Sequence, residues 1–269
     1  MQGGPCHHAT VVAVRAAGQR MEHDTEIGGA ADGFPLTRGS AVLAAKSGDL
    51  ETRRRAHVLI VAAYWKPVYK HVRLKWRAAN EDAKDLTQAF FTHAIEKGVF
   101  ERYDPRQAAF RTYLRVCLDR FVSNERLAQS RLKRGGGSAR LSLDFEGAEQ
   151  ELSAARAPAG DDPQRGFERE CLRSLFAQAI DEFRAACEAA GHATRLRLFE
   201  RYDLCEPSER AELTYQRLAA DHGLKVTDVT NHLAAARRMF REILLQRLRA
   251  LCGSEQEFRA EARAILGGS

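Results

Sequence analysis

Residues 214–241 read TYQRLAADHGLKVTDVTNHLAAARRMFR, and their pattern decides the fold predicted for the second half of the chain. Five apolar or small residues have the spacing of two short helices that cross closely: Leu218, Ala219, Leu224, Val229 and Leu233. Gly223 lies between the two helices, where glycine adopts a positive φ at low cost. Thr214 and Thr227 are the candidate N-caps. The segment predicts a helix-turn-helix, and an ordinary helical hairpin is the alternative.

The second helix of this segment carries polar side chains where a helix-turn-helix touches DNA. Its first turns hold the candidate residues for reading base edges: Thr227, Thr230, Asn231 and His232. Arg237, Arg238 and Arg241 follow as candidate phosphate contacts. Residues 225–249 hold 6 basic and 2 acidic side chains, which favours an anionic partner. Asp228 would repel phosphate unless it caps the helix.

Apolar residues at helical spacing continue outward on both sides of this segment. Upstream, Leu175, Phe183 and Cys187 predict a helix that Gly191 ends, and Pro207 breaks the helix after it. Downstream, residues 254–267 predict either an extra helix packed on the second domain or a regulatory contact.

The first half of the chain shows the same period. Spacings of four and three residues give one apolar stripe on a helix: Val58, Ala62, Trp65, Tyr69, Val72 and Trp76. Pro67 lies inside this helix and predicts a kink or a local break. Asn80 is the expected N-cap of a second helix, and Gly98 is its expected stop.

A third helix is expected to start at Asp104 and Pro105, an N-cap residue followed by proline at the first helical position. Its buried side is predicted to consist of Phe110, Tyr113, Leu114, Cys117 and Phe121. We expect it to run to about Arg134, before three consecutive glycines. Since no segment shows a convincing strand alternation, the predicted fold class is all-α.

Composition divides the chain into five predicted parts. Residues 1–39 form a disordered or weakly ordered arm, and residues 40–134 form a first small helical domain. Residues 135–162 form a flexible acidic linker, because they are rich in Gly, Ala, Ser, Pro and acidic residues. Residues 163–252 form a second small helical domain with the helix-turn-helix, and residues 253–269 form a tail.

The basic excess is concentrated in the first domain. The whole chain has a formal net charge of +6, whereas residues 40–134 alone hold 20 basic and 10 acidic side chains. Residues 135–190 hold 6 basic and 11 acidic ones. A concentrated basic block suggests a nucleic-acid partner, and a solvated Arg-rich helical surface is the alternative.

The sequence lacks the patterns of several other classes of protein. It contains no Gly-rich phosphate loop after a strand and no Gly-x-Ser-x-Gly turn, so we expect no catalytic residues. The six cysteines form no Cys-x-x-Cys pair, and Cys6, His7 and His8 are too close together to close a tetrahedral metal site alone. No cofactor or metal is therefore expected. No apolar run approaches the roughly 20 residues of a membrane span, and no signal-peptide layout is present, which together favour a cytoplasmic protein.

Four segments, in this order, carry a family resemblance. They are Tyr64-Trp65-Lys66-Pro67-Val68-Tyr69, then Asp85-Leu86-Thr87-Gln88-Ala89-Phe90-Phe91, then Phe110-Arg111-Thr112-Tyr113-Leu114 with residues 121–126, and finally Leu213-Thr214-Tyr215 before the helix-turn-helix. Over about residues 50–134 and 165–250 the chain resembles a bacterial RNA polymerase sigma factor of the extracytoplasmic-function type. The second and fourth segments are specific as a pair.

The resemblance implies a role for each segment. Binding of core RNA polymerase, through its β and β′ subunits, would fall to Asp85, Leu86, Gln88 and Phe91. Capture and melting of the minus-ten element would fall to Arg111, Arg115, Arg120, Asn124, Arg126 and Arg131. Recognition of the minus-thirty-five element would fall to Thr227, Thr230, Asn231, His232, Arg237 and Arg238. The acidic linker would run through the RNA exit path, and an anti-sigma factor is left open as a further partner.

The sequence departs from the family pattern at Arg120, Asn124 and Lys225, where relatives often carry Asn, Asp and a small capping residue. These departures concern the promoter sequence rather than the class of protein. Two other functions stay open at this point. One is a stand-alone helix-turn-helix regulator that binds duplex DNA as a dimer, and the other is a helical adaptor for proteins, against which the basic block argues.

Overall fold

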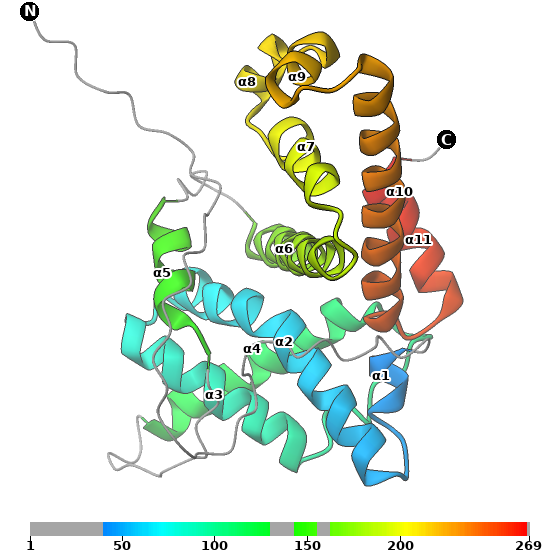
Figure 1. The fold of residues 1–269 in the computed structure, drawn as a ribbon. Coiled ribbons are helices and arrows are strands. Elements are labelled where there is room, and N and C mark those ends of the chain that lie inside the picture. Colours follow the sequence, from blue (N-terminus) through cyan, green and yellow to red (C-terminus); the bar gives the residue numbers. More distant parts are fainter. Residues whose placement is uncertain (1–39, 130–142, 155–161, 268–269) are drawn as a thin grey trace, which may run out of the picture. The chain divides into compact units, whose positions relative to one another are not determined.

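The computed structural model describes residues 40–129, 143–154 and 162–267 (Figure 1). Within these ranges the regular elements are all helices and no strand occurs, so the predicted all-α class is confirmed. The described residues form two compact units, of which the first holds residues 41–174 and the second holds Ser40 and residues 175–267. The division falls inside a helix, after Ser174, and not at residue 163 as the composition suggested.

The first unit contains five helices and the start of a sixth. They are α1 (Ala41–Ala44), α2 (Leu50–Lys75), α3 (Asn80–Glu96), α4 (Phe110–Gln129), α5 (Phe145–Ala154) and the beginning of α6 (Pro163–Ala189). The second unit contains the rest of α6, then α7 (Ala193–Asp203), α8 (Pro207–Glu212), α9 (Tyr215–His222), α10 (Val226–Ala250) and α11 (Glu255–Leu266).

Helix α2 is the central element of the first unit, and its buried face differs from the predicted stripe. Its buried apolar residues before Tyr69 and Val72 include Ile60, Tyr64 and Val68, whereas Ala62 is exposed and Val58, Trp65 and Trp76 are half-buried. The predicted stripe is therefore wrong in its first half. The reason is that α2 packs against α1, α3 and α5, so more than one side of the helix is covered.

The expected break at Pro67 is also wrong, because α2 runs unbroken across it. Proline has no N–H to donate to the carbonyl four residues earlier, which is that of Ala63. The Ser174 hydroxyl on α6 donates a hydrogen bond of 2.9 Å to this carbonyl instead. A side chain 111 residues away thus satisfies the backbone acceptor that the proline leaves open.

Helix α3 begins one residue earlier than expected, with Ala79 as the N-cap and Asn80 as the first helical residue. The Asn80 amide oxygen accepts a 2.7 Å hydrogen bond from the Tyr69 hydroxyl, so this side chain joins α2 to α3. Gly98, just beyond the helix, has a φ of +61°, which confirms the predicted stop.

Helix α4 begins at Phe110, and the predicted start at Asp104 and Pro105 is wrong. These two residues belong to a turn, because the Asp104 carboxylate accepts hydrogen bonds from the Arg106 backbone and side chain. Five α4 residues are buried: Phe110, Leu114, Leu118, Phe121 and Val122. Tyr113 and Cys117, which were expected among them, are half-buried. The predicted end near Arg134 lies outside the described residues.

A helix stands inside the predicted linker. Residues 145–154 form α5, which packs on α2 through Phe145 and Ala148, so a flexible linker over all of 135–162 is wrong. The Asp144 carboxylate accepts the Gly147 N–H at 3.0 Å and thereby caps the helix start. Helical spacing was too short here to stand out from the Gly- and Ser-rich residues around it.

The second unit has two apolar clusters. The larger one joins α6, α7, α10 and α11, and at its centre the Phe183 ring lies 4.7 Å from Phe199 and 6.0 Å from Phe240. Phe258, Ala262 and Ile265 of α11 pack against this cluster. The smaller cluster joins α7, α9 and α10, and consists of Leu198, Leu213, Leu218, Ala219, Val229 and Leu233.

Helices α9 and α10 meet at a three-residue turn. The Thr214 hydroxyl accepts the Arg217 N–H at 3.1 Å and caps α9, as predicted. Gly223 closes α9 in the left-handed conformation, with a φ of +63° and a ψ of +34°. Because the smaller cluster lies between the two helices and α7, the start of α10 is held at a fixed angle.

Candidate nucleic-acid interface

The α4 side chains that the resemblance assigns to the minus-ten element differ in their exposure to solvent. Arg120, Asn124 and Arg126 are exposed, whereas Arg111 and Arg115 are half-buried and Arg131 lies outside the described residues. Arg115 donates to Asp119 at 3.3 Å and to Gln164 at 2.9 Å. Its guanidinium therefore joins α4 to α6, and the expected role of Arg115 in binding DNA stays a prediction.

Trp76 lies beside this face and was expected only as a packing residue. It follows the last turn of α2 and is half-buried. The Arg126 guanidinium lies 5.1 Å from the centre of its ring, and the Lys75 ammonium lies at 5.5 Å. Arg126 also donates to the Trp76 carbonyl. An aromatic ring with cations near it can stack on an unpaired base while the cations contact phosphate. The run Lys75-Trp76-Arg77 is the sequence signal that could have identified it.

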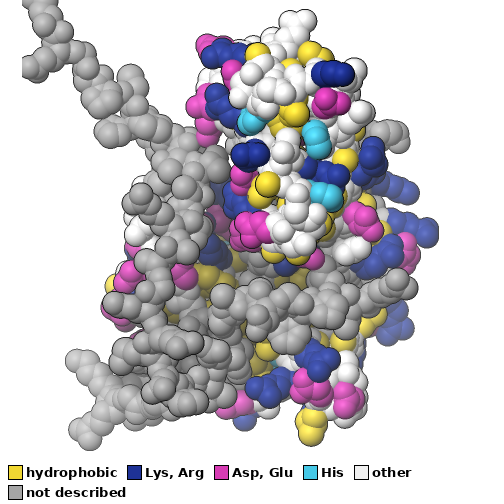
Figure 2. All heavy atoms as spheres, viewed as in Figure 1, with side chains coloured by type: hydrophobic (Ala, Val, Ile, Leu, Met, Phe, Trp, Pro, Cys, Tyr) yellow, Lys and Arg dark blue, Asp and Glu magenta, His cyan; other side chains and the backbone are white. Residues whose placement is uncertain are grey.

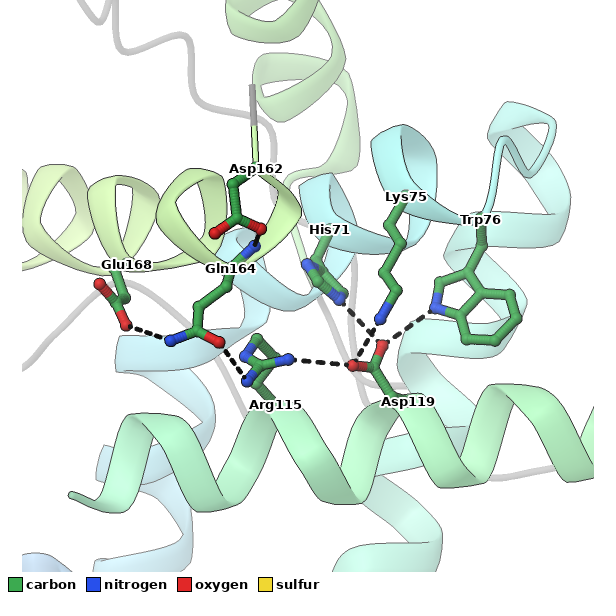
Figure 3. A network of polar contacts seen from close by, with 8 residues as sticks. All are labelled: His71, Lys75, Trp76, Arg115, Asp119, Asp162, Gln164 and Glu168. Carbon is green, nitrogen blue, oxygen red and sulfur yellow. Dashed lines mark hydrogen bonds and ion pairs between the residues drawn. The ribbon is translucent and has the colours of Figure 1, made fainter. Parts of the chain in front are cut away.

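Asp119 holds this part of the interface together (Figure 3). One of its carboxylate oxygens contacts His71 Nε2 at 3.0 Å and accepts from Trp76 Nε1 at 3.2 Å. The other accepts from Lys75 Nζ at 2.7 Å and from Arg115. Asp119 on α4 therefore fixes the end of α2, including the Trp76 indole.

The charge of Asp119 follows from these contacts. Its burial by itself raises the pKa of the carboxyl, but hydrogen bonds from His71 and Lys75 outweigh that effect and lower the pKa to about 2. The carboxylate is therefore ionised at neutral pH. Lys75 and Arg115 are partly neutralised by it, whereas Arg120 and Arg126 are exposed and have no contact with Asp119.

The α3 residues expected to dock on the polymerase lie on two sides of the helix. Asp85 is exposed and Gln88 is half-buried. Leu86 is 8% exposed, and Phe91 is fully buried against Phe90. The interface expected of α3 is thereby corrected, since Phe91 packs in the core and only Asp85 and Gln88 reach the surface substantially.

In the second unit, the first turns of α10 present the predicted readout residues. Thr227, Thr230 and Asn231 are exposed and His232 is half-buried. Lys225, and not Thr227, occupies the N-cap position, and the Asp228 carboxylate accepts the Lys225 N–H at 3.4 Å. Asp228 thus caps the helix. Figure 2 shows Lys and Arg side chains, with Asp and Glu side chains among them, on the side of the second unit where α10 and α11 lie.

Arg237 is bound inside the second unit. Its guanidinium donates to the Asp203 carboxylate of α7 at 2.9, 3.0 and 3.2 Å and to the Tyr215 hydroxyl of α9 at 3.3 Å. It also lies 5.6 Å from the Tyr202 ring. Hydrogen bonding to Asp203 raises the pKa of Arg237. Arg237 ties α7, α9 and α10 together, whereas Arg238 and Arg241 are exposed. The expected phosphate contact therefore stays a prediction, and these two exposed residues can make it with fewer competing bonds.

Other kinds of site have little support in the described part of the chain. No group of three or more His, Cys, Asp or Glu side chains there could hold a metal ion. None of its helices has the length and apolar character needed to cross a membrane. The candidate Cys6, His7 and His8 lies outside the described residues.

Comparison of the chain with protein-family models, with curated proteins and with solved structures finds no match.

Proposed function

We propose that this protein is a sigma factor that binds core RNA polymerase, recognises promoter DNA and helps to open it. The observation that carries the proposal is the geometry of α9 and α10. A capped helix, a left-handed glycine and a second helix with exposed polar residues at its start support the proposal of a DNA-binding helix-turn-helix. The basic, aromatic face of α4 and the end of α2 in the same chain supplies a place for a single strand.

Recognition of duplex DNA would use the first two turns of α10. Thr227, Thr230 and Asn231 carry donors and acceptors that reach base edges when a helix enters the major groove N-terminus first. Arg238 and Arg241 would contact the phosphates on either side. Arg237 would not contact DNA and would keep the angle between α10 and the α7–α9 pair.

Strand opening would use the first unit. Unstacking one base costs a few kcal/mol, and stacking on an aromatic side chain returns about 1–3 kcal/mol for each base. Trp76 could provide such stacking, while Arg120, Asn124 and Arg126 would hold the backbone. No covalent chemistry is required, so the proposal involves no catalytic residue, metal or cofactor. The partners would be core polymerase and promoter DNA in the cytoplasm, and an anti-sigma factor stays open.

Replacing both Asp85 and Gln88 by Ala should reduce promoter-dependent transcription at least tenfold. The two side chains carry the exposed part of the proposed polymerase contact, and losing two hydrogen-bonding groups at an interface removes on the order of 2 kcal/mol. The measurement is run-off transcription from a library of duplex fragments with bacterial core polymerase, with co-purification of core as the binding assay.

Glu81 and Asp82, which are exposed in the first turn of the same helix, supply the control variant. Unchanged co-purification of the Asp85/Gln88 variant with core polymerase would remove α3 from the proposed interface. Absence of promoter-dependent transcription with the unchanged chain would refute the sigma-factor proposal itself.

Replacing Arg238 and Arg241 by Ala should weaken binding of any duplex and reduce the slope of log affinity against log salt by about 2. Each exposed guanidinium would otherwise displace counterions from one phosphate. Fluorescence anisotropy of a labelled duplex at several salt concentrations measures the slope. Arg237→Ala is the informative contrast, because it should lower the melting temperature and leave the slope of the folded protein nearly unchanged. The opposite pattern would mean that Arg237 binds phosphate.

A stand-alone helix-turn-helix regulator is the second candidate, favoured by the way α7, α9 and α10 enclose a core of their own. Such a protein binds duplex DNA without polymerase and as a dimer on a two-fold site. A gel shift with and without core polymerase, together with the mass in solution, separates the two functions.

A further inference from the structure

One face of α2 combines aromatic rings with cations. Lys66, Lys70 and Arg73 follow one another at spacings of four and three residues, so they lie on one side of the helix. Trp65 and Tyr69 lie beside them. We call the surface formed by these five residues the α2 face. Cations in a row with aromatic rings among them form the kind of surface that binds single-stranded nucleic acid.

Acidic groups of the same chain occupy this face. The Glu149 carboxylate of α5 accepts hydrogen bonds from Arg73 Nη2 at 2.5 Å and from Arg73 Nε at 3.0 Å. It also accepts a hydrogen bond from the Tyr69 hydroxyl at 2.5 Å. Glu151 accepts from Lys66 at 2.8 Å and from Lys70 at 2.9 Å. Its two ammonium partners lie on successive turns of α2. The two carboxylates thus form ion pairs with all three cations of the α2 face. Successive phosphates of a nucleic-acid strand would contact these cations in the same way.

Both acidic groups are anions at neutral pH. The hydrogen bond from Arg73 lowers the pKa of Glu149. For Glu151, burial by itself raises the pKa, but hydrogen bonds from Lys66 and Lys70 outweigh it and lower the pKa. Lys70 has one further partner, Glu170 of α6 at 2.8 Å. Lys66 and Arg73 therefore depend on α5 for their carboxylate partners more than Lys70 does.

Helix α5 is attached to the first unit by few buried side chains. Among its described side chains only Phe145 and Ala148 are buried. Phe145 lies 5.6 Å from the Trp65 ring and 5.2 Å from the Tyr69 ring. A helix of ten residues is too short to be stable by itself in water, and Gly147 lowers its propensity further. The Glu149 and Glu151 side chains are each about a quarter exposed, so their ion pairs are sensitive to salt.

From these observations we propose that the α2 face is a binding surface for single-stranded nucleic acid, and that α5 occupies it as an internal competitor. The strand would place phosphates on Lys66 and Arg73 and a base on Trp65 once α5 has left. This surface is separate from the proposed Trp76–Arg126 contact, and the inference does not depend on the sigma-factor proposal. An acidic protein segment is the rival occupant, which the aromatic rings disfavour.

The test uses a labelled 20-nucleotide oligothymidylate and the whole chain carrying Trp76→Phe. The sequence has two tryptophans, so Trp65 is then the remaining one and reports on α5. Glu149→Gln with Glu151→Gln should detach α5, shift Trp65 emission to the red and raise oligonucleotide affinity about tenfold at low salt. The gain arises because the face no longer has to be uncovered first.

Two further variants separate the α2 face from general charge effects. Glu146→Gln with Glu96→Gln removes two exposed carboxylates, one on α5 and one at the end of α3, outside the ion pairs with Lys66, Lys70 and Arg73, and should leave affinity within about twofold of the parent. Adding Lys66→Ala to the Glu149/Glu151 variant should abolish most of the gain. An equal gain in the Glu146/Glu96 control would overturn the proposal, as would a red-shifted Trp65 emission without a gain in affinity.

If the Glu149/Glu151 variant loses its helical circular dichroism, the parent chain supplies the test. Saturation with oligothymidylate should then quench Trp65, because a base stacks on the ring, and added salt should reverse the change. Unaltered Trp65 emission at saturation would refute the proposal. So would a poly-glutamate peptide that displaces α5 at the same concentration as the oligonucleotide, because it would identify an acidic protein as the partner.

Discussion

Replacing Asp119 by Ala should lower the free energy of unfolding of the first unit by about 3 kcal/mol. The substitution takes the carboxylate from His71, Lys75 and Arg115, and a buried charge that loses its partner costs about 3–5 kcal/mol. We take the lower end because Lys75 is about a third exposed. Urea unfolding followed by circular dichroism measures the change.

The pH dependence provides an independent measurement on the same residue. The pKa of Asp119 is lowered from 3.8 to about 2 on folding. A depressed carboxyl contributes stability that is present above its unfolded pKa and is lost as the pH falls through the folded value. Asp119 therefore contributes about 2 kcal/mol above pH 4, and this contribution should disappear between about pH 4 and pH 2. The Asp119→Ala variant should lack that part of the acid transition.

Asp82→Ala is the matched control, because Asp82 is exposed in the first turn of α3. This substitution should lower the free energy of unfolding by only a few tenths of a kcal/mol. Equal stability losses in the two variants would contradict the central role given to Asp119. Since Trp76 donates to Asp119, the Asp119 variant should also alter tryptophan emission while the chain is still folded.

Replacing Phe183 by Ala should lower the free energy of unfolding of the second unit by about 3–5 kcal/mol. This is the range for replacing a large core side chain by alanine. Phe183 is fully buried, with Phe199, Phe240 and the aliphatic residues of the larger cluster around it. The substitution leaves a cavity behind α10, so thermal unfolding should occur at a lower temperature and duplex binding should fail at a lower temperature. Differential scanning calorimetry together with anisotropy on duplex DNA measures both effects.

Phe176 provides the control for Phe183, because it lies on the same helix and is half-buried. The centre of its ring lies 6.4 Å from that of Phe240. Phe176→Ala should cost less than half as much. If the Phe183 variant kept full stability but lost duplex binding, the ring would have a direct role in DNA contact, contrary to its burial.

The sigma-factor proposal assigns a different form of DNA to each of the two candidate surfaces. The start of α10 presents short polar side chains, which the proposal assigns to base edges in a groove. The end of α2 with α4 presents a tryptophan with two cations near its ring, which the proposal assigns to unpaired bases. Each surface rests on an ion-pair centre, Asp119 in the first unit and Asp203 in the second, that fixes the helices behind it. Substitutions at these two aspartates should therefore alter DNA binding indirectly, through helix orientation.

Local sequence determined much of the fold. The period of apolar residues is sufficient for an all-helical chain, because an amphipathic helix must bury one stripe whatever its partner is. Thr214 and Gly223 fixed the ends of α9, because capping and positive φ are properties of a few neighbouring residues. The same holds for Gly98 after α3.

Only the tertiary structure decided which side chains are exposed to solvent and which are bound or buried by other residues. Arg237 and Arg238 are neighbours in sequence, yet one is bound by Asp203 and Tyr215 and the other is exposed. Phe91 and Asp85 belong to one motif, yet one is in the core. Helix α5 and the unbroken α2 at Pro67 likewise depend on distant partners, Trp65 and Ser174. The physical reason is that helical spacing specifies only the direction in which a side chain points around the axis of its helix. The residue that pairs with its charge, or the element that buries it, lies elsewhere in the chain and is not specified by that spacing.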